Sequence, residues 1–171
     1  METAGTVTLQ GNPFTLVGRP VEVGQSAPTF GAVDNDLNPV NLESLRGKVV
    51  ILASVPSLDT PVCDMETRRF NSEAAALGDD VTIVTISMDL PFAQKRWCGA
   101  AGIDRVVTWS DHRDAAFGMG YGLLIKELRL LARAVLVIDA QGIIRYKELV
   151  GEVTNEPDYQ AALNAARNCA A

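Results

Sequence analysis

One cysteine of this chain lies where the sequence favours reactive sulfur chemistry. Cys63 ends the segment 56–63, PSLDTPVC, which directly follows the apolar run 49–55. The pattern predicts a buried strand, a tight turn and a helix whose first turn carries the thiol. Unpaired backbone N–H groups and the positive end of a helix dipole stabilise a thiolate at such a position. Because the thiolate is the reactive form of cysteine, we expect redox or nucleophilic chemistry at Cys63.

A structural interpretation of the same cysteine stays open on these residues alone. Buried cysteines often act as small hydrophobic side chains, and Cys63 could simply pack the start of a helix. Asp64 and Glu66 follow in the same turn. Their carboxylates favour a helix start, but they would repel a thiolate that they faced. The strand–turn–helix context balances the two interpretations without deciding between them.

Residues beside the cysteine would shape its surroundings. Thr60 is expected to be the N-cap of the helix, with Pro61 at the first helical position. The Thr60 hydroxyl could then serve either a backbone N–H group or the neighbouring sulfur. Pro56 restricts the path of the chain from the strand into the turn.

Arg133 is the candidate cation for a thiolate. It is embedded in the apolar run 130–135, LLARAV. Burying an unpaired charge is expensive, so we expect Arg133 to have an anionic partner in the fold. That partner is either the thiolate or a carboxylate in a structural ion pair, and spacing alone leaves both open.

The remaining cysteines and the one histidine carry weaker signals. Cys98 lies in a second expected helix, too far along the chain from Cys63 for a Cys-x-x-Cys motif. It is either inert or a resolving thiol that captures an oxidised Cys63 as a disulfide. We interpret Cys169 as incidental and His112 as part of a solvated loop. These side chains lack the paired spacing of zinc ligands, so we expect no metal and no cofactor.

Composition narrows the class of protein. A length of 171 residues suits one domain, which we expect to span 1–171. The net charge of −6 and the absence of a Lys/Arg cluster argue against a nucleic-acid binder. No apolar run approaches the roughly 20 residues that cross a bilayer. The N-terminal residues lack the pattern of a secretory signal, so we expect a reducing cytoplasm, where a disulfide is transient rather than structural.

The elements that must position these residues alternate along the chain. A hairpin is expected over 6–17 around a turn at 11–13, then an extended connection at 18–32 and a helical turn at 41–47. Strands are expected at 49–55, 81–88, 106–109, 134–138 and 143–147, and helices at 61–77, 91–100, 114–117 and 157–168. This order predicts an α/β fold with a mixed central sheet and helices on both faces. Cys63 would then lie at the carboxyl end of a central strand, a common place for active sites.

Segment 56–63 resembles the peroxiredoxin signature Pro-x-x-x-Thr-x-x-Cys. The fuller similarity is to the bacterial thiol peroxidase branch, the atypical two-cysteine peroxiredoxins, and it covers nearly the whole chain. The stretches that match, in order, are 55–71, 89–94, 97–100, 110–111, 117–118, 121–122, 132–135, 146–148 and 156–157. A series of this kind is far more specific than an isolated Thr-x-x-Cys.

The resemblance implies a thioredoxin-like fold with an N-terminal β-hairpin. It implies that Cys63 is the peroxidatic cysteine, held by Thr60 and Arg133, and that Pro56 shields the substrate pocket. Cys98 would be the resolving cysteine of the same chain, giving a Cys63–Cys98 redox disulfide. The expected substrate is hydrogen peroxide or an alkyl hydroperoxide. A homodimer and reduction by thioredoxin are also implied.

One departure and two alternatives accompany the resemblance. Segment 125–131, IKELRLL, lacks the Gly-Pro-Leu-type turn of many relatives, which leaves the loop before Arg133 and the dimer contact open. A peroxide-responsive redox sensor or chaperone would use the same oxidation to change partners, without needing fast turnover. A purely structural thioredoxin-like binding module would leave Cys63 no more reactive than an ordinary thiol.

Overall fold

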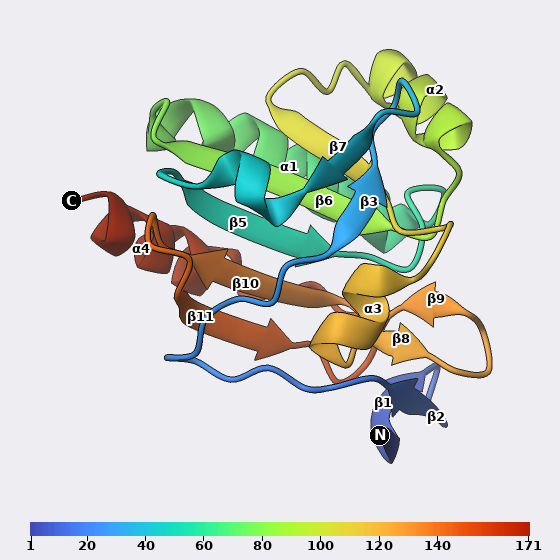
Figure 1. The fold of residues 1–171 in the computed structure, drawn as a ribbon. Helices are drawn as coiled ribbons and strands as arrows, with labels where there is room; N and C mark the ends of the chain where they lie inside the picture. The colour runs from blue at the N-terminus through green and yellow to red at the C-terminus, as the bar shows by residue number, and fades with distance from the viewer.

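The computed structural model describes residues 1–171, and a seven-stranded mixed sheet forms its centre (Figure 1). The strand order is β11-β10-β5-β6-β7-β3-β4. Strands β5, β6 and β7 are parallel. On either side, β10 and β3 pair antiparallel with β5 and β7, and the edge strands β11 and β4 pair antiparallel with β10 and β3. The bounds are β3 (Gly31–Val33), β4 (Pro39–Asn41), β5 (Val49–Ser54), β6 (Val81–Ser87), β7 (Val106–Ser110), β10 (Ala134–Ile138) and β11 (Ile144–Leu149).

Two helices cover one face of this sheet. Phe70 of α1 (Pro61–Leu77) and Tyr159 and Leu163 of α4 (Tyr159–Ala170) pack against alternate residues of the central strands, among them Ile51 and Val135. Every residue of β5 is buried, because layers pack on both of its sides. This explains why the β5 sequence is a continuous apolar run rather than an alternating one.

The opposite face is covered by a short helix and a second, smaller sheet. Phe117 and Tyr121 of α3 (Ala116–Tyr121) join the cluster that contains Leu52 and Val84 of the central strands. The small sheet has the order β1-β2-β8-β9, with β1 (Glu2–Leu9), β2 (Asn12–Val17), β8 (Leu124–Ile125) and β9 (Leu130–Leu131). Helices therefore lie on both faces of the main sheet, as the sequence predicts.

Most predicted elements are confirmed. The helix expected at 61–77 has those bounds, and α2 (Pro91–Ala101) extends one residue beyond its prediction. The helical turn expected at 41–47 is a 3₁₀ turn, η1 (Leu42–Leu45). The strand predicted at 134–138 has the bounds of β10, and the other predicted strands differ from β5, β6, β7 and β11 by one or two residues at their ends. No helix has both the length and the apolar character needed to span a membrane.

The predicted hairpin turn was misplaced. Pro13 pairs with Thr8 inside the ladder, and the turn consists of Gln10 and Gly11 instead of residues 11–13. Both turn residues have positive φ, 51° and 79°, as in the type I′ turn of a two-residue hairpin. Pro13 lies in β2, one residue after the pair that closes the turn. The sequence had indicated a loop at this proline.

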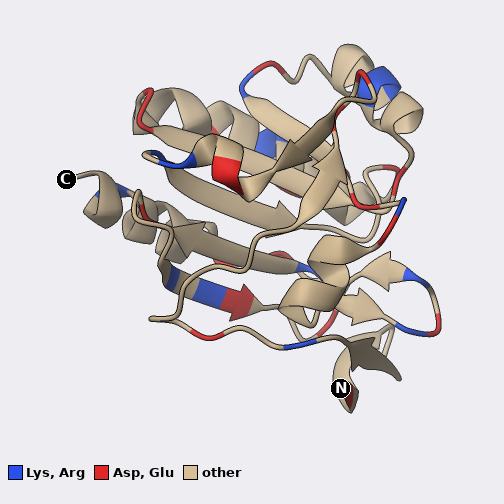
Figure 2. Cartoon of the chain, viewed as in Figure 1, with Lys and Arg blue, Asp and Glu red and all other residues tan.

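Charged residues are spread over the whole ribbon. Lys and Arg lie on many elements and are interspersed with Asp and Glu (Figure 2). Several form exposed ion pairs, such as Arg46–Glu43 at 2.7 Å and Lys126–Glu2 at 2.7 Å. Exposed pairs of this kind add little to stability, so the charges that matter for chemistry are the buried ones.

Candidate active site

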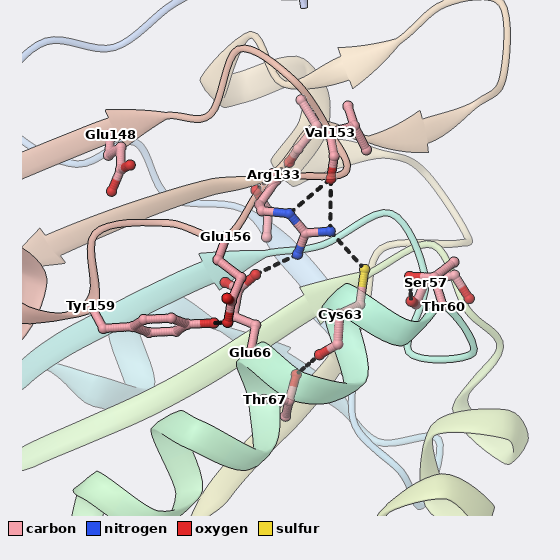
Figure 3. A network of polar contacts seen from close by, with 12 residues as sticks. Ser57, Thr60, Cys63, Glu66, Thr67, Arg133, Glu148, Val153, Glu156 and Tyr159 are labelled. Atoms are coloured by element: carbon pink, nitrogen blue, oxygen red, sulfur yellow. Dashed lines mark hydrogen bonds and ion pairs between the residues drawn. The ribbon is translucent and has the colours of Figure 1, made fainter. Parts of the chain in front are cut away.

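Cys63 lies in the first turn of α1, just beyond the carboxyl end of β5 (Figure 3). Its side chain is fully buried. The predicted strand–turn–helix arrangement is confirmed. Val55, Leu58 and Trp97 surround the cysteine as a small apolar cluster.

A carboxylate from the neighbouring strand fixes the turn before the cysteine. Asp89 follows β6 and accepts hydrogen bonds from the Ser57 hydroxyl at 2.7 Å and the Leu58 backbone N–H at 2.8 Å. The Ser87 hydroxyl donates to the same carboxylate at 2.7 Å. Sequence reasoning did not assign Asp89 to the site. The available signal was its place after a second parallel strand, at the same sheet edge as the turn.

The Thr60 hydroxyl has neither of the partners expected for it. Thr60 has the extended backbone of an N-cap residue, but its side chain caps no N–H group of α1. Instead the hydroxyl donates to the carbonyl of Ser57 at 2.9 Å. The reason is the tight turn, which brings that carbonyl within reach of the side chain. With its proton engaged, the Thr60 oxygen keeps a lone pair that can accept a hydrogen bond.

Arg133 links the cysteine to a buried carboxylate (Figure 3). Its Nη2 donates to Cys63 Sγ at 3.2 Å, and its Nη1 donates to Glu66 Oε2. Nε and Nη2 also donate to the carbonyl of Val153, at 3.1 and 3.0 Å. Both partners considered from the sequence are therefore present at once, since the planar guanidinium can serve several acceptors.

Electrostatics in this network reflect its burial. Only 1% of the Arg133 side chain and none of the Glu66 side chain is exposed. Burial raises the pKa of Glu66 to about 7, even though Arg133 opposes that shift. Burial would lower the pKa of Arg133, but Glu66 and Cys63 outweigh it and raise that pKa, so the guanidinium stays charged. Glu66 Oε1 has no hydrogen-bond partner, so the Glu66 carboxyl is bound through Oε2 alone.

An apolar cavity of about 180 Å³ adjoins the guanidinium. Pro56, Thr60 and Arg133 contribute to its wall, which places three of the predicted site residues around one space. Cys63 is not part of the wall, because its side chain is buried behind it. The other lining residues are Leu9, Pro61, Val62, Ile125, Leu128, Leu130, Val153 and Thr154.

The segment 125–131 builds part of that wall. It forms a tight hairpin in which Leu124 pairs with Leu131 and Ile125 with Leu130. Arg129 adopts a positive φ of 50° at its tip. The segment contributes Ile125, Leu128 and Leu130 to the wall of the cavity.

Cys98 lies on α2 and packs against the cluster that surrounds Cys63. Its sulfur is 3.5 Å from the Thr108 hydroxyl. The three cysteines are free thiols. Cys169 packs with the core of α1 and α4 instead, where burial raises its pKa. His112 shares a hydrogen bond with the Ser110 hydroxyl at 2.9 Å and has no contact with Cys63.

Known proteins are similar to this chain over most of its length. The Redoxin family model matches residues 22–163. A thiol peroxidase of Halalkalibacterium halodurans is 55% identical over 162 residues, covering 95% of this chain and 97% of its own. A thiol peroxidase of Bacillus subtilis is 55% identical over 161 residues, covering 94% and 96%. The crystal structure of a peroxiredoxin-like protein from Aquifex aeolicus superimposes with a TM-score of 0.90 at 43% identity, covering 97% and 98%.

Proposed function

Because the chain belongs to the redoxin family and to its bacterial thiol peroxidases, we propose that it reduces hydrogen peroxide and alkyl hydroperoxides at Cys63. The enzyme is thus a peroxidase and an oxidoreductase. The observation that carries the assignment to Cys63 is the 3.2 Å contact between its sulfur and the buried Arg133 guanidinium. A fixed cation at that distance favours the thiolate, the form that attacks peroxide.

In the first step the Cys63 thiolate attacks the terminal oxygen of the hydroperoxide. A sulfur–oxygen bond forms and the oxygen–oxygen bond breaks, which leaves a sulfenic acid and, after protonation, water or an alcohol. Arg133 can stabilise the charge that moves from sulfur to the leaving oxygen, and the free lone pair of Thr60 can accept a hydrogen bond from the peroxide. Because Cys63 is fully buried, the wall beside it must open for the substrate to reach the sulfur.

In the second step the Cys98 sulfur attacks the sulfenic sulfur and expels water, which gives a Cys63–Cys98 disulfide. Each cysteine lies in a helix, α1 or α2. A disulfide needs Cα atoms within about 7 Å, so we expect a turn of one helix to unwind. The shared apolar cluster of Val55, Leu58 and Trp97 keeps the two segments adjacent and supports this pairing.

Thioredoxin is the reductant that we propose for the third step. Its thiolate would reopen the disulfide by exchange and return both cysteines to the reduced state. We also propose that residues 1–171 form one domain, that the enzyme acts as a homodimer and that it works in the cytoplasm. These proposals follow the family rather than a contact of this chain.

The test is one equivalent of cumene hydroperoxide added to the reduced protein, followed by intact mass and peptide mapping. Loss of two hydrogens with a Cys63–Cys98 link supports the full cycle. Cys63→Ser should abolish turnover. Cys98→Ser should gain one oxygen at Cys63 and stall, and Cys169→Ser is the matched control that should cycle normally. No mass change in the wild type would overturn the assignment, and normal cycling by Cys98→Ser with thioredoxin would remove Cys98 from it.

A further inference from the structure

We propose that Thr108 and Asn35 are positioning residues for Cys98. They hold its sulfur as a hydrogen-bonded thiol and thereby slow its departure from α2. The inference concerns the second cysteine, whose role in the cycle rests on the proposed function. The restraint of the Cys98 sulfur by Thr108 can be tested without that function.

The direction of the hydrogen bonds carries the argument. The Thr108 hydroxyl donates its one proton to Asn35 Oδ1 at 2.9 Å. In the 3.5 Å contact between Cys98 Sγ and Thr108 Oγ1, the thiol must then be the donor. A thiolate has no proton to give and would face the lone pairs of the Thr108 oxygen. The geometry of the contact therefore fits a Cys98 thiol that donates to Thr108.

Thr108 is well placed to impose this preference. It lies on β7, and only 3% of its surface is exposed. Water therefore competes little for its oxygen, and a buried hydrogen bond is costly to leave unmade. Its neighbour on β6, Thr85, is paired with it in register and is equally buried, but the Thr85 hydroxyl has no hydrogen-bond partner. The sheet thus offers a threonine of the same kind that does not bond to Cys98.

Asn35 is itself held by a rigid turn. The turn lies between β3 and β4, and the Asp34 carboxylate accepts backbone N–H groups of Asp36 at 2.8 Å and Asn38 at 2.9 Å. Lys95 of α2 reaches the same turn through a 2.6 Å ion pair with Asp36. That pair is exposed and adds little. The link through the buried Thr108 side chain is accordingly the one that restrains the cysteine.

The consequence concerns the rate of disulfide formation. The thiolate of a resolving cysteine is the attacking species, and the Cys98 sulfur must leave Thr108 before it can reach Cys63. Thr108→Val removes the acceptor while keeping the shape of the side chain. We expect it to raise the rate of disulfide formation roughly five-fold, the factor that corresponds to one ordinary hydrogen bond. Oxidation of Cys63 itself should not change.

The experiment compares Thr108→Val with Thr108→Ser, which keeps the hydroxyl, and with Thr85→Val as the matched control. Trp97 is a built-in reporter, since it lies in the Cys63 cluster and its indole N–H donates to Asp64 of α1 at 2.9 Å. Stopped-flow fluorescence after one equivalent of hydrogen peroxide should give a faster second phase in Thr108→Val alone. Thr108→Ser and Thr85→Val should match the wild type.

A second readout does not depend on the catalytic cycle. In a Cys63→Ser, Cys169→Ser background, iodoacetamide modifies Cys98 only. Thr108→Val should raise the alkylation rate of Cys98 at neutral pH. Thr108→Ser should keep the alkylation rate of the wild-type residue. Equal alkylation of Thr108→Val and Thr85→Val, or slower alkylation of Thr108→Val, would overturn the inference. If the wild type forms no disulfide but the alkylation result holds, the proposed cycle fails while the inference about Thr108 stands.

Discussion

The stability of Glu66→Gln relative to the wild type should rise as the pH rises towards 8, although the change removes the charge that pairs with Arg133. Glu66 is fully buried, and burial raises its pKa from 4.5 to about 7 despite the neighbouring guanidinium. A folded-state pKa above the unfolded value means that the folded state binds the proton more tightly. The stability from this group is fully present below pH 4.5 and is lost as the pH rises to about 7.

The size of the effect follows from that shift. The two values that define it, 4.5 and about 7, are separated by roughly 2.5 units. At 1.36 kcal/mol per unit, the wild type loses about 3 kcal/mol of unfolding free energy over this range because of Glu66. Glutamine keeps the carbonyl oxygen for Arg133 and has no proton to lose. The stability difference, variant minus wild type, should therefore grow by about 3 kcal/mol between pH 4.5 and pH 8.

Urea unfolding of the reduced proteins at four pH values measures this difference. Trp97 and Trp109 are both nearly buried, so their fluorescence reports the loss of the core. Glu152→Gln is the matched control. In the wild type, the hydrogen bond from the Thr8 hydroxyl is the main cause that lowers the pKa of Glu152 to about 2. Folded Glu152 therefore stays ionised between pH 5 and pH 8. The stability difference of Glu152→Gln from the wild type should be flat between pH 5 and pH 8.

The opposite trend would refute the reasoning. If the unfolding free energy of Glu66→Gln falls relative to the wild type as the pH rises, the attraction between Glu66 and Arg133 outweighs the cost of burying the carboxylate. A constant difference would mean that the acid does not titrate in this range. Either result would remove burial as the dominant effect on this group.

Three further changes test other parts of the site. Arg133→Lys should lower kcat/KM at least ten-fold, because one ammonium group cannot bind Cys63, Glu66 and the Val153 carbonyl together. Each lost charged hydrogen bond is worth about 2 kcal/mol. Unchanged peroxidase kinetics would contradict the geometry. Leu128→Ala should lower kcat/KM for cumene hydroperoxide about three- to ten-fold but leave that for hydrogen peroxide unchanged, because it widens the apolar wall; equal losses for both would exclude a selective role. Gly18→Ala should cost at least about 2 kcal/mol in urea unfolding, because its Cβ would lie 2.3 Å from the Met119 carbonyl oxygen, whereas Gly24→Ala, also at positive φ but in open space, should cost clearly less.

The central part of the fold was readable because its signals are local. The apolar run of β5 and the Thr-Pro start of α1 lie within fifteen residues of each other, and together they predict where Cys63 sits. The strands β3, β4, β8 and β9 have only two or three residues each, too few for a periodic pattern. They exist because neighbouring strands complete their hydrogen bonds, which no local pattern reveals.

The sequence predicted which residues form the site better than it predicted their hydrogen-bond partners. An arginine within an apolar run predicts a buried partner, but Glu66 lies 67 positions away and the pattern does not name it. The Thr60 hydroxyl was assigned to an N–H group or the sulfur, and it bonds to Ser57 because of the tightness of the turn. Thr108 and Asp89 were not assigned to the site from the sequence, since each acts through a contact with a distant part of the chain that no local pattern reveals.

The N-terminal hairpin has a consequence for the growing chain. Thr8 binds segment 151–153 through its backbone, at 2.7 Å to the Gly151 carbonyl and 2.8 Å from the Val153 N–H, and Val153 in turn holds Arg133. These contacts join positions up to 145 residues apart, and Cys63 meets Arg133 across 70. Such long closures form late. A growing chain therefore lacks the complete network around Cys63 until residue 153 has emerged, because Arg133 and the Val153 carbonyl that holds it are both made long after the cysteine.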